Sequence, residues 1–405
     1  MARLADDCFA HGGAPMTVAA AEAALCARLA PRGGEEWAPL EAALGRVLAR
    51  PLRAATPLPP FAQSAVDGYA FRHADLSPDA ATRLALAGRI PAGGAGAPLG
   101  PGEAARIFTG APLPAGADTV MMQEDAQAEP GVVCLPAGLA AGANRRAAGE
   151  ELPAGAEALP AGLHLHAGAI GLAAALGAAQ LPLRPRLRVG VLSTGDELAG
   201  PGVVLGPAQT HDANRPLLCA LLARLPAAVS DLGILRDDAA LTARALAAAA
   251  AGQDLLITTG GVAEGEADHL RAALPGAALW RLALKPGRAV TLGVAAGTPV
   301  LGLPGNPAAA LAAFLHLARP LILHLAGAAP APLPRLAARA GFAFDKRPGR
   351  REHLVVRLAG EEAVLVGPLR LAALAAGDAL AELGEEVTAV RPGDALPLLP
   401  FAAIF

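Results

Sequence analysis

Acidic side chains follow three apolar segments in the second half of this 405-residue chain. They are Asp196 and Glu197, then Asp237 and Asp238, and then Glu264, Glu266 and Asp268. Unpaired carboxylates gathered at one place repel one another, so a divalent cation or neighbouring basic groups must hold them ionised. Hard oxygen ligands favour Mg²⁺ over thiophilic metals. The sequence therefore predicts a magnesium site, with Asp196, Glu197, Asp237 and Asp238 as the metal ligands.

Three loops in the same region combine glycine with small or polar residues. Each loop follows an apolar run that is typical of a buried strand, and such loops can turn open backbone N–H groups toward an anion. Their residues are Ser193, Thr194 and Gly195, then Gly260 and Gly261, and then Pro304, Gly305, Asn306 and Pro307. Several such loops in one region predict a phosphate-rich ligand.

A short cationic turn, Lys285-Pro-Gly-Arg288, joins two further apolar runs. Two apolar runs joined by a tight glycine turn are typical of a β-hairpin. In a hairpin of this kind, Lys285 and Arg288 would lie near the acidic edge and could bind a phosphate or a tetrahedral oxyanion.

Several of these residues, taken one at a time, also have simpler structural roles. Asp238 could cap the helix that follows it, and Glu266 and Asp268 could favour a helix dipole. Asn306 could be a turn residue. Helix-start preferences, however, do not require Thr-Gly or Gly-Gly pairs in the same loops or a cationic turn beside them. Taken together, the residues favour a functional site.

An alternation of strands and helices over residues 187–328 must position these loops. Strands are expected near 187–192, 229–235, 254–258 and 298–303, and helices near 214–224, 239–251, 266–274 and 307–326. This pattern predicts a doubly wound α/β domain with a largely parallel sheet. Ligands bind such sheets outside the carboxyl ends of the strands, which is where the loops described above would lie.

The rest of the chain predicts further domains around this one. Residues 15–50 have helical spacing, residues 61–142 contain short β-like pieces, and a helix returns at 168–176. An inserted β-rich domain between two pieces of an elongated helical body explains this return. Short strands near the end predict a small β-barrel or sandwich, and we expect a barrel. The expected boundaries are 1–14 for a flexible extension, 15–57 with 144–185 for the helical body, 58–143, 186–328 and 329–405.

Composition argues against several classes of protein. A net charge of −3, without a clustered basic stripe, argues against binding to nucleic acid. Cys8, Cys26, Cys134 and Cys219 lack metal-ligand or paired spacing, which favours a reducing compartment. The N-terminus lacks a signal-peptide pattern, and charged residues and a proline interrupt the apolar run 308–326, so no membrane span is expected. We therefore expect a cytoplasmic protein.

Six motifs occur in the order seen in one known family. They are Ser64-Ala-Val-Asp-Gly-Tyr-Ala70, Phe108-Thr-Gly-Ala-Pro112, Ser193-Thr-Gly-Asp-Glu197, Gly260-Gly-Val-Ala-Glu-Gly-Glu-Ala-Asp268, Leu284-Lys-Pro-Gly-Arg288 and Leu303-Pro-Gly-Asn-Pro307. The chain resembles the molybdopterin molybdenumtransferases of the MoeA type and the carboxy-terminal domain of gephyrin. The likeness runs from about residue 15 to the end and is weaker after residue 328.

The resemblance implies Mg²⁺-dependent insertion of molybdate into adenylylated molybdopterin, with release of AMP and formation of the molybdenum cofactor. It implies a homodimer in which the β-rich domain of one subunit completes the site of the other, and molybdopterin adenylyltransferase is a possible partner. The catalytic residues implied by motif are Asp67, Thr109, Glu197, Asp237, Asp268, Lys285 and Arg288. Glu266, Arg350 and Arg351 would contact the cofactor together with the glycine loops.

Two departures from the family pattern bear on this expectation. Ala372 and Ala373 stand where many relatives carry serines, so a hydroxyl that could bind an anion is absent. Arg288 stands where others often have lysine, and it keeps the charge while adding a bidentate donor fork.

Two alternatives therefore stay open. The absent serines favour a non-enzymatic protein that binds or delivers the cofactor. The other alternative is molybdopterin adenylyltransferase, which resembles the α/β domain alone, so the additional domains argue against it.

Overall fold

A computed structural model describes residues 14–261 and 269–405 of the chain. The chain forms two compact units. The first unit contains the described residues up to Arg50, Ala161–His166 and Leu181–Phe405, and the second contains Pro51–Pro160 and Ala167–Gln180. The finer domain boundaries expected from the sequence stay predictions.

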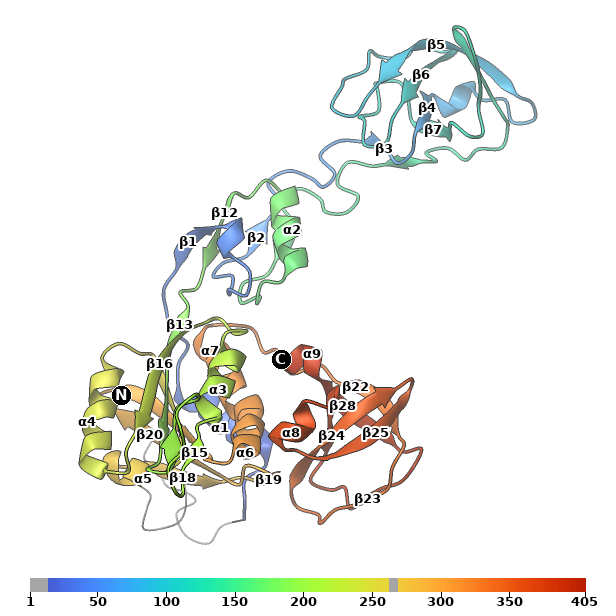
Figure 1. The fold of residues 1–405 in the computed structure, drawn as a ribbon. Helices are drawn as coiled ribbons and strands as arrows, with labels where there is room; N and C mark the ends of the chain where they lie inside the picture. Colours follow the sequence, from blue (N-terminus) through green and yellow to red (C-terminus); the bar gives the residue numbers. More distant parts are fainter. Residues whose placement is uncertain (1–13, 262–268) are drawn as a thin grey trace. The chain divides into compact units, whose positions relative to one another are not determined.

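A six-stranded sheet forms the centre of the first unit (Figure 1). Its order is β16 (Ala227–Leu235), β13 (Leu187–Thr194), β17 (Leu255–Thr259), β21 (Thr298–Leu303), β20 (Ala289–Ala295) and β18 (Ala278–Arg281). The first four strands pair in parallel, and β20 and β18 add an antiparallel hairpin. Both the doubly wound α/β domain and the hairpin predicted from the sequence are confirmed.

Helices cover both faces of this sheet because neighbouring strand residues point to opposite sides. Val191 and Ile257 join the larger core, whereas Leu192 and Leu256 join the core beneath α4 and α5. The larger core is formed with α1 (Val18–Arg28), α3 (Asn214–Leu222), α6 (Pro307–Ala313), the π-helical segment η3 (Phe314–Ala318) and α7 (Arg319–Leu325). On the other face lie α4 (Ala239–Ala250) and α5 (His269–Ala273). Strands buried on both faces explain the continuous apolar runs of the sequence.

The helical run Pro307–Leu325 is long and apolar enough to cross a membrane by length and composition. Inside the protein, however, 83% of its most apolar window is buried. A core helix of a folded domain passes the same test, and its apolar side chains are already covered by the sheet and by α1.

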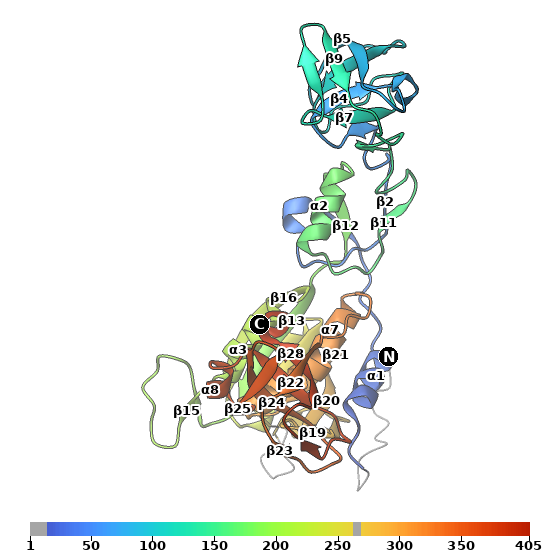
Figure 2. The same ribbon diagram turned by 90° about the vertical axis from the view of Figure 1, so that its right-hand side faces the viewer.

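A closed β-barrel ends the chain (Figure 2). The strands are β22 (Leu336–Ala340), β24 (Arg351–Ala359), β25 (Glu362–Pro368), β26 (Ala379–Leu383) and β28 (Ala395–Pro400), with the short β19 (Leu284–Lys285) added beside β24. Pairing of β24 with β26 closes the barrel. Leu354 and Leu398 fill its interior, while Val355 and Leu399 point outward and join the α/β core. The predicted barrel is confirmed.

The second unit is built around another six-stranded sheet. Its order is β7 (Thr119–Met122), β4 (Gly68–Phe71), β6 (Glu103–Ile107), β5 (Thr82–Ile90), β9 (Val132–Leu135) and β8 (Gln127–Glu129). Tyr69 and Phe71 face one core of this sheet, and Ala70 faces the other. The sequence prediction of a β-rich region is confirmed.

Shorter elements complete both units. In the second unit they are η2 (His73–Asp75), α2 (Ala167–Ala175) and the pairs β2 (Leu52–Arg53) with β11 (Glu157–Leu159) and β3 (Gln63–Ser64) with β10 (Arg145–Arg146). In the first unit they are β14 (Leu198–Ala199) with β15 (Thr210–His211), β23 (Phe344–Asp345) with β27 (Ala389–Val390), α8 (Leu371–Leu374) and α9 (Phe401–Ile404).

The helical spacing of residues 15–50 predicts helix over residues 40–48 too, and there the prediction is wrong. The chain there forms β1 (Glu36–Pro39), the short 3₁₀ helix η1 (Leu40–Ala42) and an extended stretch, and β1 pairs with β12 (Gln180–Leu183). Backbone bonds to distant segments replace helical ones, since Leu48 N–H donates to Leu163 O at 3.0 Å. Gly45, with φ of 69°, breaks the run, and Leu44 is 57% exposed. Tertiary pairing thus overrides helical spacing.

Gly68→Ala tests the packing of β4, because a Cβ at this position would lie 1.9 Å from Met121 O of the neighbouring strand. We expect the variant to lose about 1–3 kcal/mol of unfolding free energy, or more, through overpacking. Gly88→Ala in β5 of the same sheet is the control, since nothing lies within 4 Å of its Cβ position. Urea unfolding followed by circular dichroism measures both, and equal stabilities would contradict the assignment.

Candidate functional site

The hydroxyl groups at the end of β13 hold the strands of the sheet together. The Oγ atoms of Ser193 and Thr259 lie 3.1 Å apart, and Thr194 Oγ1 donates to Thr259 O at 3.4 Å. Ser193 is fully buried and Thr194 is 6% exposed. The loop that follows β13 is therefore firmly attached to the end of β17, although Ser193 itself is not open to a ligand.

The two loops after β13 and β17 approach each other closely at Gly260. This residue has φ of 88°, and a Cβ here would lie 2.4 Å from Thr194 O. Gly260 N–H also donates to Leu303 O at 3.2 Å, which connects it to the end of β21. Glycine is required here by backbone contact, and that contact brings three predicted loops to one edge of the sheet.

Asn306 caps the helix that follows β21. Its Oδ1 accepts from Ala308 N–H at 3.0 Å and from Ala309 N–H at 3.2 Å, and Pro307 occupies the first helical turn. Gly305 is exposed, and its carbonyl oxygen accepts a hydrogen bond from Asn214 Nδ2 at 2.7 Å, which fixes the loop. Sequence reasoning missed Asn214, because an asparagine at the start of a helix indicates only a cap.

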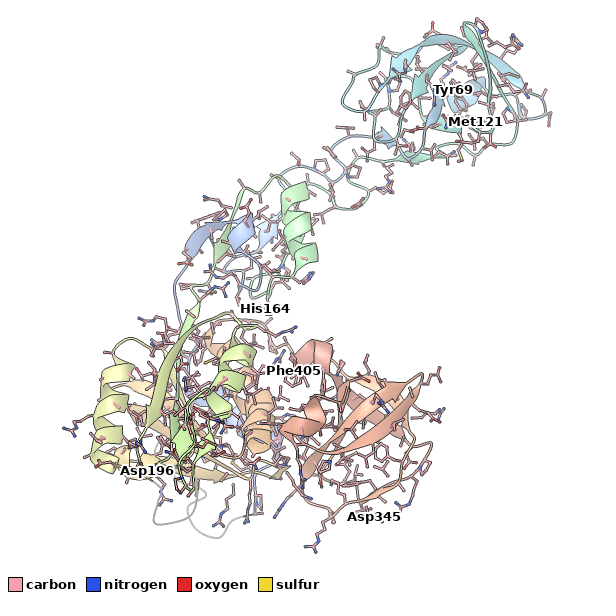
Figure 3. The ribbon with its side chains drawn as sticks, in the orientation of Figure 1. Tyr69, Met121, His164, Asp196, Asp345 and Phe405 are labelled. Atoms are coloured by element: carbon pink, nitrogen blue, oxygen red, sulfur yellow. The ribbon has the colours of Figure 1, made fainter. Side chains whose placement is uncertain are left out.

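Two of the predicted acidic sets meet beyond the ends of β13 and β16. Asp196, labelled in Figure 3, accepts from Asp237 N–H through Oδ1 at 3.3 Å. Asp196 and Glu197 are exposed, and Asp237 is half-buried. Arg236 lies beside them, with Nη1 3.2 Å from Asp196 O and 3.8 Å from its Oδ1. This arginine, which no sequence motif singles out, supplies one of the balancing charges.

The other predicted acids have different surroundings. Asp238 caps α4 by accepting from Leu241 N–H at 2.8 Å, which is the simpler role considered for it. Glu264, Glu266 and Asp268 lie outside the described residues.

The cationic turn lies at the same edge of the sheet. Thr291 is opposite Gly302 in antiparallel register, so Ala289 falls level with Pro304, and Arg288 lies just beyond. Arg288 is exposed, whereas Lys285 Nζ pairs with Glu352 Oε1 at 2.8 Å. This pairing joins the turn to the barrel because Glu352 belongs to β24, where its side chain is 8% exposed.

The two predicted arginines of the barrel differ in their surroundings: one is exposed, and the other is bonded to carboxylates. Arg350 is exposed. Arg351 Nη1 donates to Glu382 Oε1 at 2.9 Å, and its Nη2 donates to Glu385 Oε2 at 3.3 Å. Arg351 is thus held inside the barrel wall, and of the pair Arg350 is the more accessible to a ligand.

Asp67 and Thr109 form a tight pair in the second unit. Asp67 Oδ1 accepts from both the backbone N–H and the Oγ1 of Thr109, each at 2.8 Å. The backbone hydrogen bond lowers the pKa of Asp67 most, followed by the hydroxyl bond, so the carboxylate stays ionised. The sequence alone would assign each residue to a turn, and only the motif resemblance singled them out.

Asp238→Ala and Asp238→Asn separate the cap from other roles of this residue. The alanine variant should lose about 1 kcal/mol of unfolding free energy, because α4 loses its N-cap acceptor. The asparagine variant keeps that acceptor and should unfold at the same urea concentration as the parent chain. A loss of stability in both variants would show that charge, rather than capping, is what the position requires.

Comparisons with known proteins show the family of the chain. A family model described as the MoeA N-terminal region, domains I and II, matches residues 16–177, and one described as a probable molybdopterin binding domain matches residues 190–324. The chain is 37% identical over 297 residues to the molybdopterin molybdenumtransferase of Haemophilus influenzae, covering 72% of this chain and 73% of the relative. It is 36% identical over 377 residues to molybdopterin molybdenumtransferase 2 of Mycobacterium tuberculosis, covering 88% and 93%.

A solved structure supports the same assignment over nearly the whole chain. The molybdopterin biosynthesis moeA protein of Pyrococcus horikoshii OT3 superimposes with a TM-score of 0.81 at 25% identity, covering 95% of this chain and 99% of that one. Sequence and fold agree, and the chain belongs to the molybdopterin molybdenumtransferase family of enzymes.

Proposed function

We propose that this enzyme inserts molybdate into adenylylated molybdopterin, releasing AMP in a Mg²⁺-dependent reaction. The observation that carries the proposal is the meeting of three glycine loops, a pair of carboxylate sets and a cationic turn at one edge of the sheet. In the reaction, water adds to the adenylyl phosphorus and the bond to the molybdopterin phosphate breaks. AMP leaves. The two dithiolene sulfurs bind molybdenum, and one molybdate oxygen leaves as water with the two thiol protons.

The acidic residues suit a hard divalent cation. Asp196, Glu197 and Asp237 offer carboxylate oxygens at an exposed edge, which are the ligands that Mg²⁺ prefers. When bound, the ion would neutralise charge on the pyrophosphate. Asp238 was also predicted as a ligand; one of its oxygens caps α4, which leaves the other to face a cation.

The remaining residues would bind and orient the two substrates. The loops at Gly195, Gly260 and Gly305 would surround the substrate phosphates. The N–H groups of Gly195 and Gly260 already donate to Leu235 O and Leu303 O, so these two glycines shape the loops rather than donate to an anion. Arg288 and Lys285 carry the charge that molybdate requires, and Arg350 extends this basic surface. Ser193 and Thr194 hold the loop in place, and Glu266 and Asp268 keep their predicted roles from sequence alone.

Asp67 and Thr109 suggest a shared site. The ionised carboxylate of Asp67 and the Thr109 groups that donate to it form an ordered polar centre in the second unit. The acidic residues of the sheet edge and the cationic turn belong to the first unit. We propose a cytoplasmic homodimer in which this centre completes the site of the partner subunit. A separate molybdopterin adenylyltransferase would supply the substrate.

One observation favours a second function, the binding and delivery of finished cofactor. Ala372 and Ala373 on α8 carry no hydroxyl with which to hold an anion. A delivery protein would bind molybdopterin tightly and release no AMP, so the two functions differ in a single measurable product.

Glu197→Gln and Asp237→Asn test the acidic centre. Each variant should release AMP from adenylylated molybdopterin at least about tenfold more slowly, because removing one charge weakens binding of the cation. Thermal unfolding should be unchanged, since solvent-facing loop acids contribute little to the core. Glu361→Gln, an exposed acid in a barrel turn, is the matched control and should turn over normally. Full activity in both site variants would show that the site lies elsewhere.

Arg288→Gln tests oxyanion binding more cleanly than a change at Lys285, whose loss would leave the buried Glu352 unpaired. We expect the molybdate concentration for half-maximal rate to rise about tenfold or more, because the exposed guanidinium is removed from the anion. Arg391→Gln, which removes an exposed arginine paired with Asp345 on the barrel, serves as the control. An unchanged molybdate dependence in Arg288→Gln would remove this residue from the site.

A further inference from the structure

Two histidines and a glutamate lie together where the barrel meets the α/β domain of the first unit. His316 belongs to the π-helical segment η3, His353 to β24 and Glu382 to β26. The three residues are 7%, 1% and 5% exposed. The Nε2 atoms of the two histidines are 3.0 Å apart, and His316 Nε2 lies 3.7 Å from Glu382 Oε1. One possible ligand atom from each of the three residues lies within 4.8 Å of the other two.

A hydrogen bond between the imidazoles leaves part of this cluster unexplained. One Nε2 must donate to the other, which fixes the tautomers of both rings. Within the described part of the chain, His353 Nδ1 then has no hydrogen-bond partner, although the residue is buried. Apolar side chains would fill this junction without such a penalty, so the choice of two imidazoles and a carboxylate needs a further reason.

We propose that His316, His353 and Glu382 bind a divalent transition metal, with Zn²⁺ as the best match. Two imidazoles and one carboxylate form a known donor set for zinc with a fourth position left open. Zinc–nitrogen bonds of about 2.05 Å at a tetrahedral angle separate two nitrogens by about 3.3 Å. The present 3.0 Å separation reaches that value through a small outward shift of one ring.

The protonation of the cluster suits metal binding. Burial holds the pKa of His353 at about 4 and that of His316 well below its ordinary value, so both rings are neutral at pH 7. A metal needs a lone pair on each Nε2, so the ring that now donates through Nε2 would take its other tautomer, with the proton on Nδ1, when the metal binds.

Charge balance explains why a fourth ligand is expected. Arg335 Nε donates to Glu382 Oε2 at 2.6 Å, and Arg351 contacts both Glu382 and Glu385, so two arginines already balance two carboxylates. The added charge of the metal would therefore be unbalanced inside the protein. An anion such as hydroxide or a small carboxylate in the open position would reduce it.

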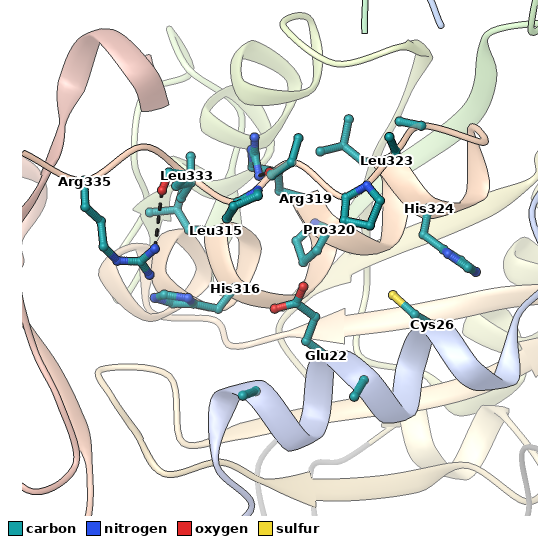
Figure 4. Close-up of a pocket in the computed structure, with 17 residues that line it drawn as sticks. Glu22, Cys26, Leu315, His316, Arg319, Pro320, Leu323, His324, Leu333 and Arg335 are labelled. Carbon is teal, nitrogen blue, oxygen red and sulfur yellow. Dashed lines mark hydrogen bonds between the residues drawn. The ribbon is translucent and has the colours of Figure 1, made fainter. Parts of the chain in front are cut away.

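A cavity provides room for that anion. It has a volume of about 550 Å³ and is lined by α1, η3, α7 and the segment before the barrel. Figure 4 shows His316 and Arg335 at one end of the cavity, with Glu22 between them and Cys26 and His324. An anion entering from this side would meet His316 and a guanidinium together. A metal bound here would link η3 to β24 and β26. This metal site is separate from the candidate site formed by the loops at the sheet edge.

Cobalt and zinc titrations of the metal-free protein test the site. The full-length chain, stripped with chelator, should bind one Zn²⁺ with histidine ligation and give a tetrahedral absorption band when Co²⁺ replaces it. Zn²⁺ should also raise the unfolding temperature of the first unit. His316→Gln and His353→Gln should each weaken zinc binding about a hundredfold or more.

Two control variants keep the test specific. His324→Gln changes another histidine at the same cavity, whose Nε2 contacts Leu29 O at 2.7 Å, and should keep the cobalt band. Glu197→Gln weakens the proposed Mg²⁺ site and should keep the band too. Absence of the band in the parent chain would overturn the proposal, even where a site variant fails to fold. A band that persists in both His316→Gln and His353→Gln would also overturn it.

Discussion

The contact between Gly260 and the end of β13 is the constraint on which the candidate site depends. The parallel pairing of β13, β17 and β21 brings three loop starts level, and a residue with a Cβ at Gly260 would collide with Thr194 O. The hydroxyls of Ser193 and Thr194 fasten the same two strands from within. With these positions fixed, the acids and the cationic turn lie at the same edge of the sheet.

The barrel extends this arrangement rather than standing apart from it. Lys285 of the turn pairs with Glu352 of β24, and Val355 and Leu399 of the barrel pack into the core formed by α6 and α7. A change in the barrel wall can therefore reach the turn that carries Arg288. The cluster of His316, His353 and Glu382 lies along the same junction, so a metal there would stiffen the support of the site without touching its substrates.

The sequence predicted the α/β domain well, because its strands and helices follow each other with clear periodicity and are buried on both faces. It failed at residues 40–48, where helical spacing is present but the backbone of Leu48 bonds to Leu163 instead. Arg236 and Asn214 could not be found from sequence, since each depends on a partner far along the chain. Asp67 and Thr109 were singled out by motif resemblance alone, and their hydrogen bonds to each other could not be predicted from it. His316 and His353, 37 positions apart, carry no spacing that predicts their contact.

Single-turnover conversion of adenylylated molybdopterin with Mg²⁺ tests the central claim most directly, with molybdate present in one reaction and absent from the other. The account predicts that AMP release requires molybdate and that one molybdenum atom becomes bound to the pterin for each AMP released. Equal AMP release without molybdate would contradict it by indicating a simple hydrolase. Tight pterin binding without AMP release, under conditions where the Haemophilus influenzae relative turns over, would contradict it in favour of a delivery protein.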